Sequence, residues 1–162
     1  MSITVRAAPL TATAFAPFGD VLEAVGPPDK MINAGRCARY HDRAVLDVSD
    51  GRAGVSVFHS ALATLPLSVP LVERHPDGAQ TFIPMSMDGF LVLVAEDADG
   101  VPVRPQAFLT EPGQGVNFHR GTWHGVLTPL SGPGLFAVVD RIGEGANLEE
   151  YPIDPPWTVT RG

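Results

Sequence analysis

Short apolar runs punctuated by Gly and Pro dominate the chain, and most of them are too brief to form helices. Val, Ile, Phe and Leu are frequent within the runs, and these residues favour strands. The runs predict strands at residues 4–8, 21–25, 55–60, 79–84, 90–95, 107–110, 116–118, 125–128 and 135–140. Turn sequences such as DADG and SGPG separate several of them. The pattern predicts a mainly antiparallel all-β protein, either a closed barrel or a two-sheet jelly roll.

Helix is expected only in short pieces. The sequence TATAFAPFG at residues 11–19 begins with a Thr that can cap a helix, and Pro17 and Gly19 then stop it. It therefore predicts one or two helical turns beside the barrel. The residues after Gly143 include the Pro-rich sequence YPIDPPW, which we expect to lie extended over the surface or against a partner.

Length and composition indicate a single globular domain covering residues 1–162. Hydrophobic residues make up 44% of the chain and charged residues 18%, which separates it from disordered proteins. The net charge of -7 and the single lysine, Lys30, argue against binding to nucleic acids or to anionic membranes.

Cysteine usage and apolar run length predict the compartment. Cys37 is the only cysteine, so no disulfide can form within the chain, and residues 1–10 lack the apolar core of a signal peptide. We therefore expect a protein of the reducing cytoplasm. Apolar runs such as FLVLVA fall far short of the roughly 20 residues that a membrane helix needs, so no membrane span is expected.

The first stretch with candidate chemistry is ERHPDGAQTFIPM, residues 73–85. Side chains alternate along a strand, so Glu73 and His75 should share one face while Arg74 takes the other. Gln80 follows at the start of the next predicted strand. The stretch thus offers a carboxylate, an imidazole and an amide for one site.

The second stretch, NFHRGTWHGVL at residues 117–127, places His119 and His124 five residues apart in an otherwise apolar sequence. With Gly113 and Gly121, their spacing resembles the second sequence motif of the cupin barrels. His119 stands where that motif usually has Pro. Three imidazoles from two separated motifs are expected to converge in a barrel mouth, a usual place for small-molecule sites.

The first cupin motif is matched more loosely. Glu73 and His75 stand like its paired His-x-His ligands, Gln80 lies near its usual Glu, and Gly89 falls close to its closing Gly. The resemblance implies a cupin-like antiparallel β-barrel or jelly roll with a few short helices.

Longer sequences resemble a narrower family. RYHD, ERHPDGAQTFIPM and GVNFHRGTWHGVL followed by VDRIG are similar to the ureidoglycolate lyase family, sometimes called ureidoglycolate hydrolase. The resemblance extends from FAPFGDVLE to VDRIG. It implies a cytoplasmic homodimer of cupin-like barrels that splits (S)-ureidoglycolate into glyoxylate and urea in allantoin catabolism, with nickel as the associated metal.

The residues offer candidates for this chemistry. Cleavage needs a grip on the substrate carboxylate, a base for the hydroxyl proton and an acid for the departing nitrogen. Histidine, with a reference pKa of about 6.5, suits both proton transfers. His119 or His124 can take one role and the other histidine the second, and His75 joins them as a catalytic candidate.

A divalent metal would assist by chelating the carboxylate and hydroxyl of the substrate and lowering the pKa of the hydroxyl. Imidazole and oxygen ligands suit nickel, zinc or iron. His75, His124, Gln80 and Glu73 are the candidate ligands, and His119 is either a further ligand or the acid-base group.

Arginine is the natural grip for a carboxylate because its guanidinium can donate two parallel hydrogen bonds. Three arginines lie beside histidines: Arg39, Arg74 and Arg120. Arg74 should point away from His75, toward an acid outside the barrel or across a dimer interface. Arg39 is the better candidate, helped by Tyr40 or His41 and by backbone N–H groups near Asn33 and Gly35.

Structural roles compete with functional ones elsewhere. His59 is expected to be a hydrogen-bonded structural residue. For His41 the structural and functional interpretations are equally good. Phe118 and Trp123 are expected in the wall and core, and Cys37 is expected to be inert.

Three other residues are expected to serve packing or surface charge. Met85 and Met87 should fill gaps in the packing. Asp140 ends an apolar strand and should form a salt bridge with Arg141 or Arg104, although it can also support the site.

Two alternatives to a lyase fit the same residues. A noncatalytic cupin that binds a small carboxylate needs the pocket but no proton-transfer pair. An amidohydrolase acting on ureidoglycolate would release ammonia and carbon dioxide rather than urea. The motif resemblance favours urea.

Overall fold

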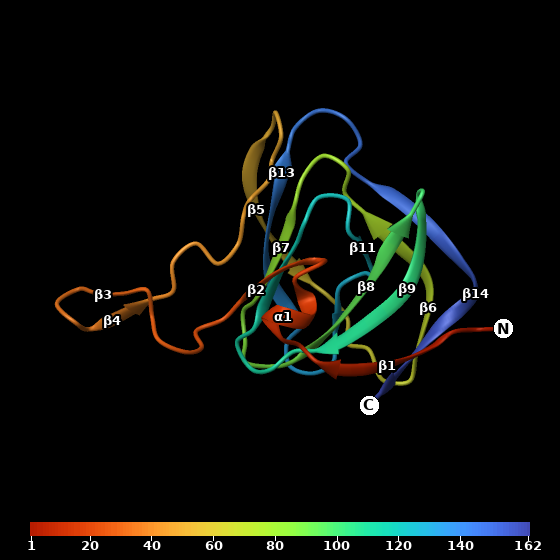
Figure 1. The fold of residues 1–162 in the computed structure, drawn as a ribbon, viewed down its shortest axis with the longest axis horizontal. Coiled ribbons are helices and arrows are strands. Elements are labelled where there is room, and N and C mark those ends of the chain that lie inside the picture. The colour runs from red at the N-terminus through yellow and green to blue at the C-terminus, as the bar shows by residue number, and fades with distance from the viewer.

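Two β-sheets that share an apolar core form the body of the protein, and a small hairpin extends from it (Figure 1). The computed structural model describes residues 1–162. The first sheet has the strand order β11 (Trp123–His124), β6 (Leu67–Arg74), β14 (Glu149–Arg161), β1 (Thr4–Pro9), β9 (Val101–Leu109), β8 (Phe90–Ala98), β12 (Thr128–Pro129). The second has the order β2 (Gly19–Leu22), β10 (Gly115–Phe118), β7 (Gln80–Pro84), β13 (Leu135–Ile142), β5 (Arg52–His59). The hairpin consists of β3 (Lys30–Ile32) and β4 (Cys37–Arg39).

The short strand β11 closes the first sheet into a barrel. His124 pairs with Glu73 of β6 on one side and with Val94 of β8 on the other, so six strands form a ring. Closure removes the open edges that a flat sheet of these strands would leave. The prediction of a mainly β, cupin-like barrel fold is confirmed.

Strand β8 is buried on both faces, which explains its unbroken apolar sequence. Phe90, Val92 and Val94 pack in the core between the two sheets. Leu91 and Leu93 point the other way and pack in the core inside the barrel. Successive residues of one strand therefore belong to different cores.

The predicted helix is present and is short. Helix α1 (Ala12–Phe15) begins after Thr11, whose side chain accepts a hydrogen bond from the N–H of Ala14 at 3.1 Å. Phe15 is fully buried and packs against Phe108 and Phe118, which anchors the helix between the sheets. No helix of the structure combines the length and apolar character needed to cross a membrane.

Most predicted strands are confirmed, with shifts of a few residues at their ends. The strand predicted at 125–128 is wrong: the chain leaves the sheet after His124 and pairs again only at Thr128. Strand β6 was not predicted as a whole because Pro66 and Pro70 interrupt its apolar pattern.

The C-terminal tail is an integral strand of the barrel, so its assignment to the surface or to a partner is wrong. Strand β14 pairs antiparallel with β6 and parallel with β1, and the register shifts at its prolines, between Pro152 and Trp157. Ile153, Trp157 and Val159 are buried in the barrel core. Strand β1 is also parallel to β9, so the barrel is not antiparallel throughout.

The two methionines expected to fill packing gaps are on the surface. Met85 is 55% exposed and Met87 is 68% exposed. Both lie at or beyond the end of β7, where the chain turns out of the sheet toward Phe90. The expectation for these residues is wrong.

Removal of the Trp157 side chain tests the structural role of the tail. We expect Trp157→Ala to lower the free energy of unfolding by about 3–5 kcal/mol, because it empties part of the barrel core. Urea denaturation measures the change, with the neighbouring Thr158→Ala as control. A Trp157→Ala protein as stable as the control would contradict the assignment of the tail to the core.

Candidate functional site

Three side chains from two distant segments form a compact group, which we call the Glu–His cluster: Glu73, His75 and His124. One ligand atom from each lies within 4.8 Å of the others. The pairing of β11 with β6 sets His124 directly opposite Glu73. His75 follows the end of β6, and its ring centroid lies 5.2 Å from that of His124. The alternation predicted for Glu73 and His75 thus places both toward one site.

His124 is fully buried and has one ring nitrogen without a partner. Its ring stacks on Phe118 at 4.2 Å between centroids and 6° between planes. Nδ1 lies 2.8 Å from the carbonyl oxygen of Gly125, which requires Nδ1 to carry the proton as donor. Nε2 then holds a lone pair, and no hydrogen-bond donor reaches it.

Burial keeps His124 neutral. Desolvation of the charged form lowers the pKa of His124 from 6.5 to about 3, and the nearby His75 adds to this effect. The hydrogen bond to the carbonyl of Gly125 acts in the opposite direction. A neutral imidazole with a free Nε2 is a good metal ligand. It is a weak proton acceptor at neutral pH, because its conjugate acid is too strong.

His75 is held from both sides by oxygen acceptors. Its Nδ1 lies 2.7 Å from the backbone oxygen of Asn147, and its Nε2 lies 2.9 Å from Oε1 of Gln80. Nε2 of Gln80 donates to Asp140 at 3.2 Å, which fixes the orientation of the amide. A chain of hydrogen bonds from β13 through β7 therefore positions the ring.

Asp140 belongs to this chain, and the salt bridge expected for it is wrong. Arg141 pairs with Asp50, and Arg104 pairs with Glu96. Alternation explains the outcome, because Asp140 shares the inward face of β13 with the buried Val138. The alternation of Val138 and Asp140 along this strand is the feature of the sequence that indicates a role for Asp140 in supporting the site.

Glu73 has a carboxyl group with a raised pKa. Burial is the main cause; the nearby His75 opposes it and Glu150 adds to it. No hydrogen bond or ion pair to another side chain holds the carboxylate in the structure. Glu73 is therefore the member of the cluster most available for proton transfer.

The cluster suits a divalent cation. It combines two imidazoles with one carboxylate, a ligand set used by nickel, zinc and iron. The lone pair on Nε2 of buried His124 has no partner, and a cation would satisfy it. Ligation by His75 would instead replace one of its two hydrogen bonds, to Asn147 or to Gln80.

His119 lies apart from the cluster. Its Nε2 is 3.1 Å from Oδ1 of Asp20, and its side chain is 44% exposed. Phe118 turns inward to stack on His124, so the next side chain turns outward. The turn after His119 is linked to the cluster only through the backbone, because the N–H of Gly121 donates to the carbonyl of His75.

Asp20, the partner of His119, is an anchored carboxylate. Burial alone would raise its pKa, but hydrogen bonds from Asn117, from the N–H of Val45 and from His119 lower it below its ordinary value. The buried Asn117 also accepts a hydrogen bond from Thr81 at 2.7 Å. This polar network sits on the outer face of the second sheet.

The arginines near the cluster are all committed to other partners. Arg74 points away from His75, as predicted: it pairs with Asp97 and Glu149 and lies 4.3 Å from the ring centroid of Trp123. Arg120 pairs with Asp47. Neither guanidinium is free to hold a substrate carboxylate at the cluster.

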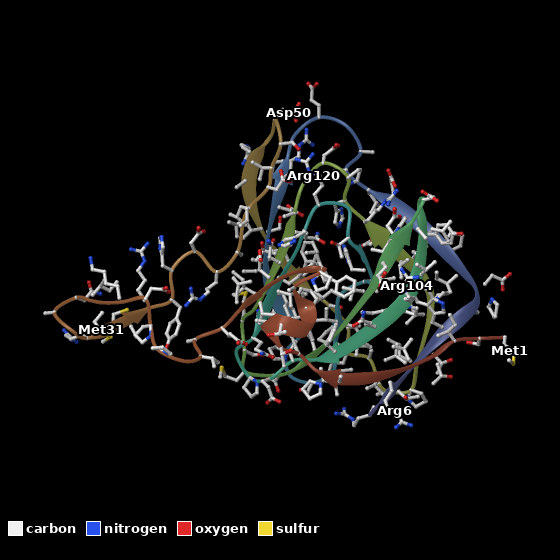
Figure 2. All side chains as sticks on the ribbon, in the orientation of Figure 1. Met1, Arg6, Met31, Asp50, Arg104 and Arg120 are labelled. Atoms are coloured by element: carbon white, nitrogen blue, oxygen red, sulfur yellow. The ribbon has the colours of Figure 1, made fainter.

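The remaining predicted substrate-binding residues lie on the hairpin or beside it. Arg39 ends β4, Tyr40 and His41 follow it, and Asn33 lies in its turn. Figure 1 shows the hairpin projecting from the barrel, and Met31 marks its outer part in Figure 2. Within one copy, the structure does not bring these residues to the cluster.

The buried state of His124 predicts a pH dependence of stability. Its pKa lies near 3 in the folded protein and near 6.5 when unfolded, so between these values the unfolded chain binds more protons. The free energy of unfolding should therefore fall as pH drops below about 6.5, by up to about 1.4 kcal/mol per pH unit.

Comparison with His124→Phe, which can keep the stack on Phe118 but cannot titrate, isolates this effect. Urea denaturation between pH 4 and pH 8 with a chelator present should show a smaller loss of stability in the variant than in the original protein. Equal slopes for both proteins would show that His124 does not titrate in this way.

Comparison with known sequences identifies the family of the chain. The sequence profile of the ureidoglycolate lyase family matches residues 2–160. A ureidoglycolate lyase of Rhodobacter capsulatus is 62% identical over 152 residues, 93% of this chain and 94% of its own length. A ureidoglycolate lyase of Chelativorans sp. is 48% identical over 155 residues, 94% of each chain, and ureidoglycolate lyase 2 of Rhizobium meliloti is 48% identical over 153 residues, 93% of this chain and 94% of its own length. The chain belongs to the ureidoglycolate lyase family.

Proposed function

We propose that this protein is a lyase that cleaves (S)-ureidoglycolate into glyoxylate and urea. The match of residues 2–160 to the ureidoglycolate lyase family carries the proposal. The Glu–His cluster supports it, because it supplies a cation site and a carboxyl group with a raised pKa in one place.

The reaction needs only a proton transfer and the breaking of one bond. The hydroxyl and the urea nitrogen are attached to the same carbon of the substrate. When the hydroxyl loses its proton, its oxygen forms a carbonyl, the carbon–nitrogen bond breaks, and the nitrogen takes a proton to leave as urea. No water is consumed, so one protein group can move the same proton from oxygen to nitrogen.

We assign this transfer to Glu73. Burial raises the pKa of its carboxyl group, which brings the group closer to the working pH of a general base. His75 is the second candidate for proton transfer, and its bonds to Asn147 and Gln80 orient it. His124 serves as a neutral ligand in this proposal, and His119 stands outside the reaction.

The cluster would hold the metal, for which nickel is our proposal. A bound divalent cation would be chelated by the carboxylate and hydroxyl of the substrate, and its positive charge would lower the pKa of the hydroxyl. His124, through its unpartnered Nε2, and His75 would hold the cation, with Glu73 beside them to carry the proton.

We further propose a cytoplasmic homodimer in which residues 1–162 form one domain. The strand pairing of β14 with β1 supports the single domain, because it joins the two ends of the chain in one sheet. The unpaired, exposed Cys37 fits a reducing compartment.

An assay for both products tests the activity. Purified protein with (S)-ureidoglycolate should release glyoxylate and urea in equal amounts, and a chelator should reduce the rate until nickel is restored. Ammonia without urea would instead support an amidohydrolase. Binding of the substrate without turnover, with and without nickel, would support a noncatalytic binding protein.

Replacement of Glu73 by Gln tests the assigned proton transfer. The substitution keeps the shape but removes the ionisable group, so we expect kcat to fall about 100-fold or more. The matched control is Glu111→Gln, at an exposed glutamate outside the cluster, where activity should change little. A Glu73→Gln protein with normal turnover would exclude the proposed role.

A further inference from the structure

A long segment of the chain lies outside both cores although it has regular structure. We call residues 26–43 the arm; it contains the hairpin, and none of its side chains is buried. Strands β3 and β4 pair only with each other. An isolated two-stranded hairpin is marginally stable in water, so the arm needs a surface to rest on.

Polar bonds hold the shape of the arm but do not attach it to the barrel. Tyr40 donates to the carbonyl of Gly26 at 2.8 Å, and Arg43 pairs with Asp29 at 2.9 Å. The apolar side chain of Met31 remains 50% exposed. The arm thus keeps its own shape but contributes no residue to either core of its own copy.

Two cations on the arm face each other without a counterion. Lys30 lies directly opposite Arg39 across the hairpin, and neither forms an ion pair in the structure. Like charges directly opposite on paired strands are destabilising. An anion placed between these two side chains would relieve the repulsion, and a carboxylate has the right charge and size.

The arm leaves the body on the side of the second sheet (Figure 1). That sheet exposes apolar side chains on its outer face. Val55 and Val57 of the edge strand β5 are 73% and 65% exposed, and Ile83 lies on the same face through the pairing of both β5 and β7 with β13. Exposed apolar strands at a sheet edge are commonly covered by another chain.

Charge separates the arm from the rest of the molecule. Residues 29–43 carry four Lys or Arg and two Asp, a net charge of +2, whereas the whole chain carries -7. The remainder therefore carries -9, and a basic arm is attracted to the acidic body of another copy. A second copy of this chain offers both the acidic body and the matching apolar face.

We propose that two copies of this chain exchange their arms, and that Lys30 and Arg39 of each arm bind the substrate carboxylate at the Glu–His cluster of the other copy. The assignment of the carboxylate rests on the proposed lyase function. It explains why the cluster has no free arginine of its own, since Arg74 and Arg120 are paired elsewhere. Each catalytic centre then needs both copies.

Single substitutions establish the role of Arg39. Loss of a charge-assisted bond to the carboxylate should lower kcat/KM of Arg39→Ala about 10- to 100-fold, mainly through KM. Arg39→Lys should recover part of the loss. Arg6→Ala, an exposed arginine of β1, is the matched control and should behave as the original protein. Unchanged kinetics in Arg39→Ala would overturn the assignment.

Mixed pairs determine whether Arg39 acts on its own copy or on the other. Copies carrying Glu73→Gln and copies carrying Arg39→Ala are co-expressed with different tags, and the mixed pair is isolated. If the arms are exchanged, one centre combines an intact Glu73 with an intact Arg39, so the pair should recover about half of the original activity at low substrate concentration. Arms acting within one copy would leave both centres defective, and no recovery would overturn the proposal.

The reciprocal pair gives the opposite result. A copy with both substitutions, paired with an unmodified copy, should have almost no activity if the arms are exchanged, because neither centre is complete. About half of the original activity in this pair would show that each arm serves its own copy and would overturn the exchange.

A measurement of mass separates this proposal from the proposed function. Sedimentation should show a pair for the original protein and single chains for Val57→Asp, which places a charge on the exposed face. Single chains for the original protein would overturn the exchange whatever the activity. A pair that does not cleave ureidoglycolate would overturn the proposed function and, with it, the assignment of the carboxylate.

Discussion

The pairing of two residues, Trp123 and His124, between β6 and β8 is the contact on which the rest of the structure depends. It closes the barrel, and the same two residues separate the barrel core from the site. Trp123 faces the barrel core, where Arg74 lies over its ring. His124 faces the other sheet and meets Glu73. Closure and site assembly are therefore one event, since a barrel that does not close leaves Glu73 and His124 on separate segments.

Burial determines what each member of the Glu–His cluster can do. Loss of hydration makes the charged form of every buried group unfavourable, so it lowers the pKa of His124 and raises that of Glu73. The histidine becomes a neutral donor of a lone pair, and the carboxyl becomes a better proton carrier. One environment thus produces two different roles from residues that lie side by side in the sheet.

Local sequence pattern predicts the helix, most strands and the face on which each side chain lies. Long-range strand pairing determines which of these side chains come together in the site. Alternation along β6 was sufficient to separate Arg74 from Glu73 and His75, and the Thr11 cap and Pro17 located the helix. Which histidine joins the cluster depends on strand register, which no local pattern encodes, so only the resemblance to the cupin motif favours His124 over His119. The tail was misjudged because its prolines sit at a register shift that only the paired strand reveals. The arm has turn residues like any loop, and nothing in its sequence indicates that it leaves the body.

Strand β8 has one further consequence, for the way sequences of this fold can diverge. Its residues alternate between two cores at steps of about 3.3 Å, so a change of volume at one position strains the packing at the next. A substitution in β8 must then be compensated by changes in both cores at once, and such paired substitutions are rare. We expect evolutionary drift to avoid β8 and to accumulate in segments such as β5, where only one face is packed and a single substitution can be accommodated alone.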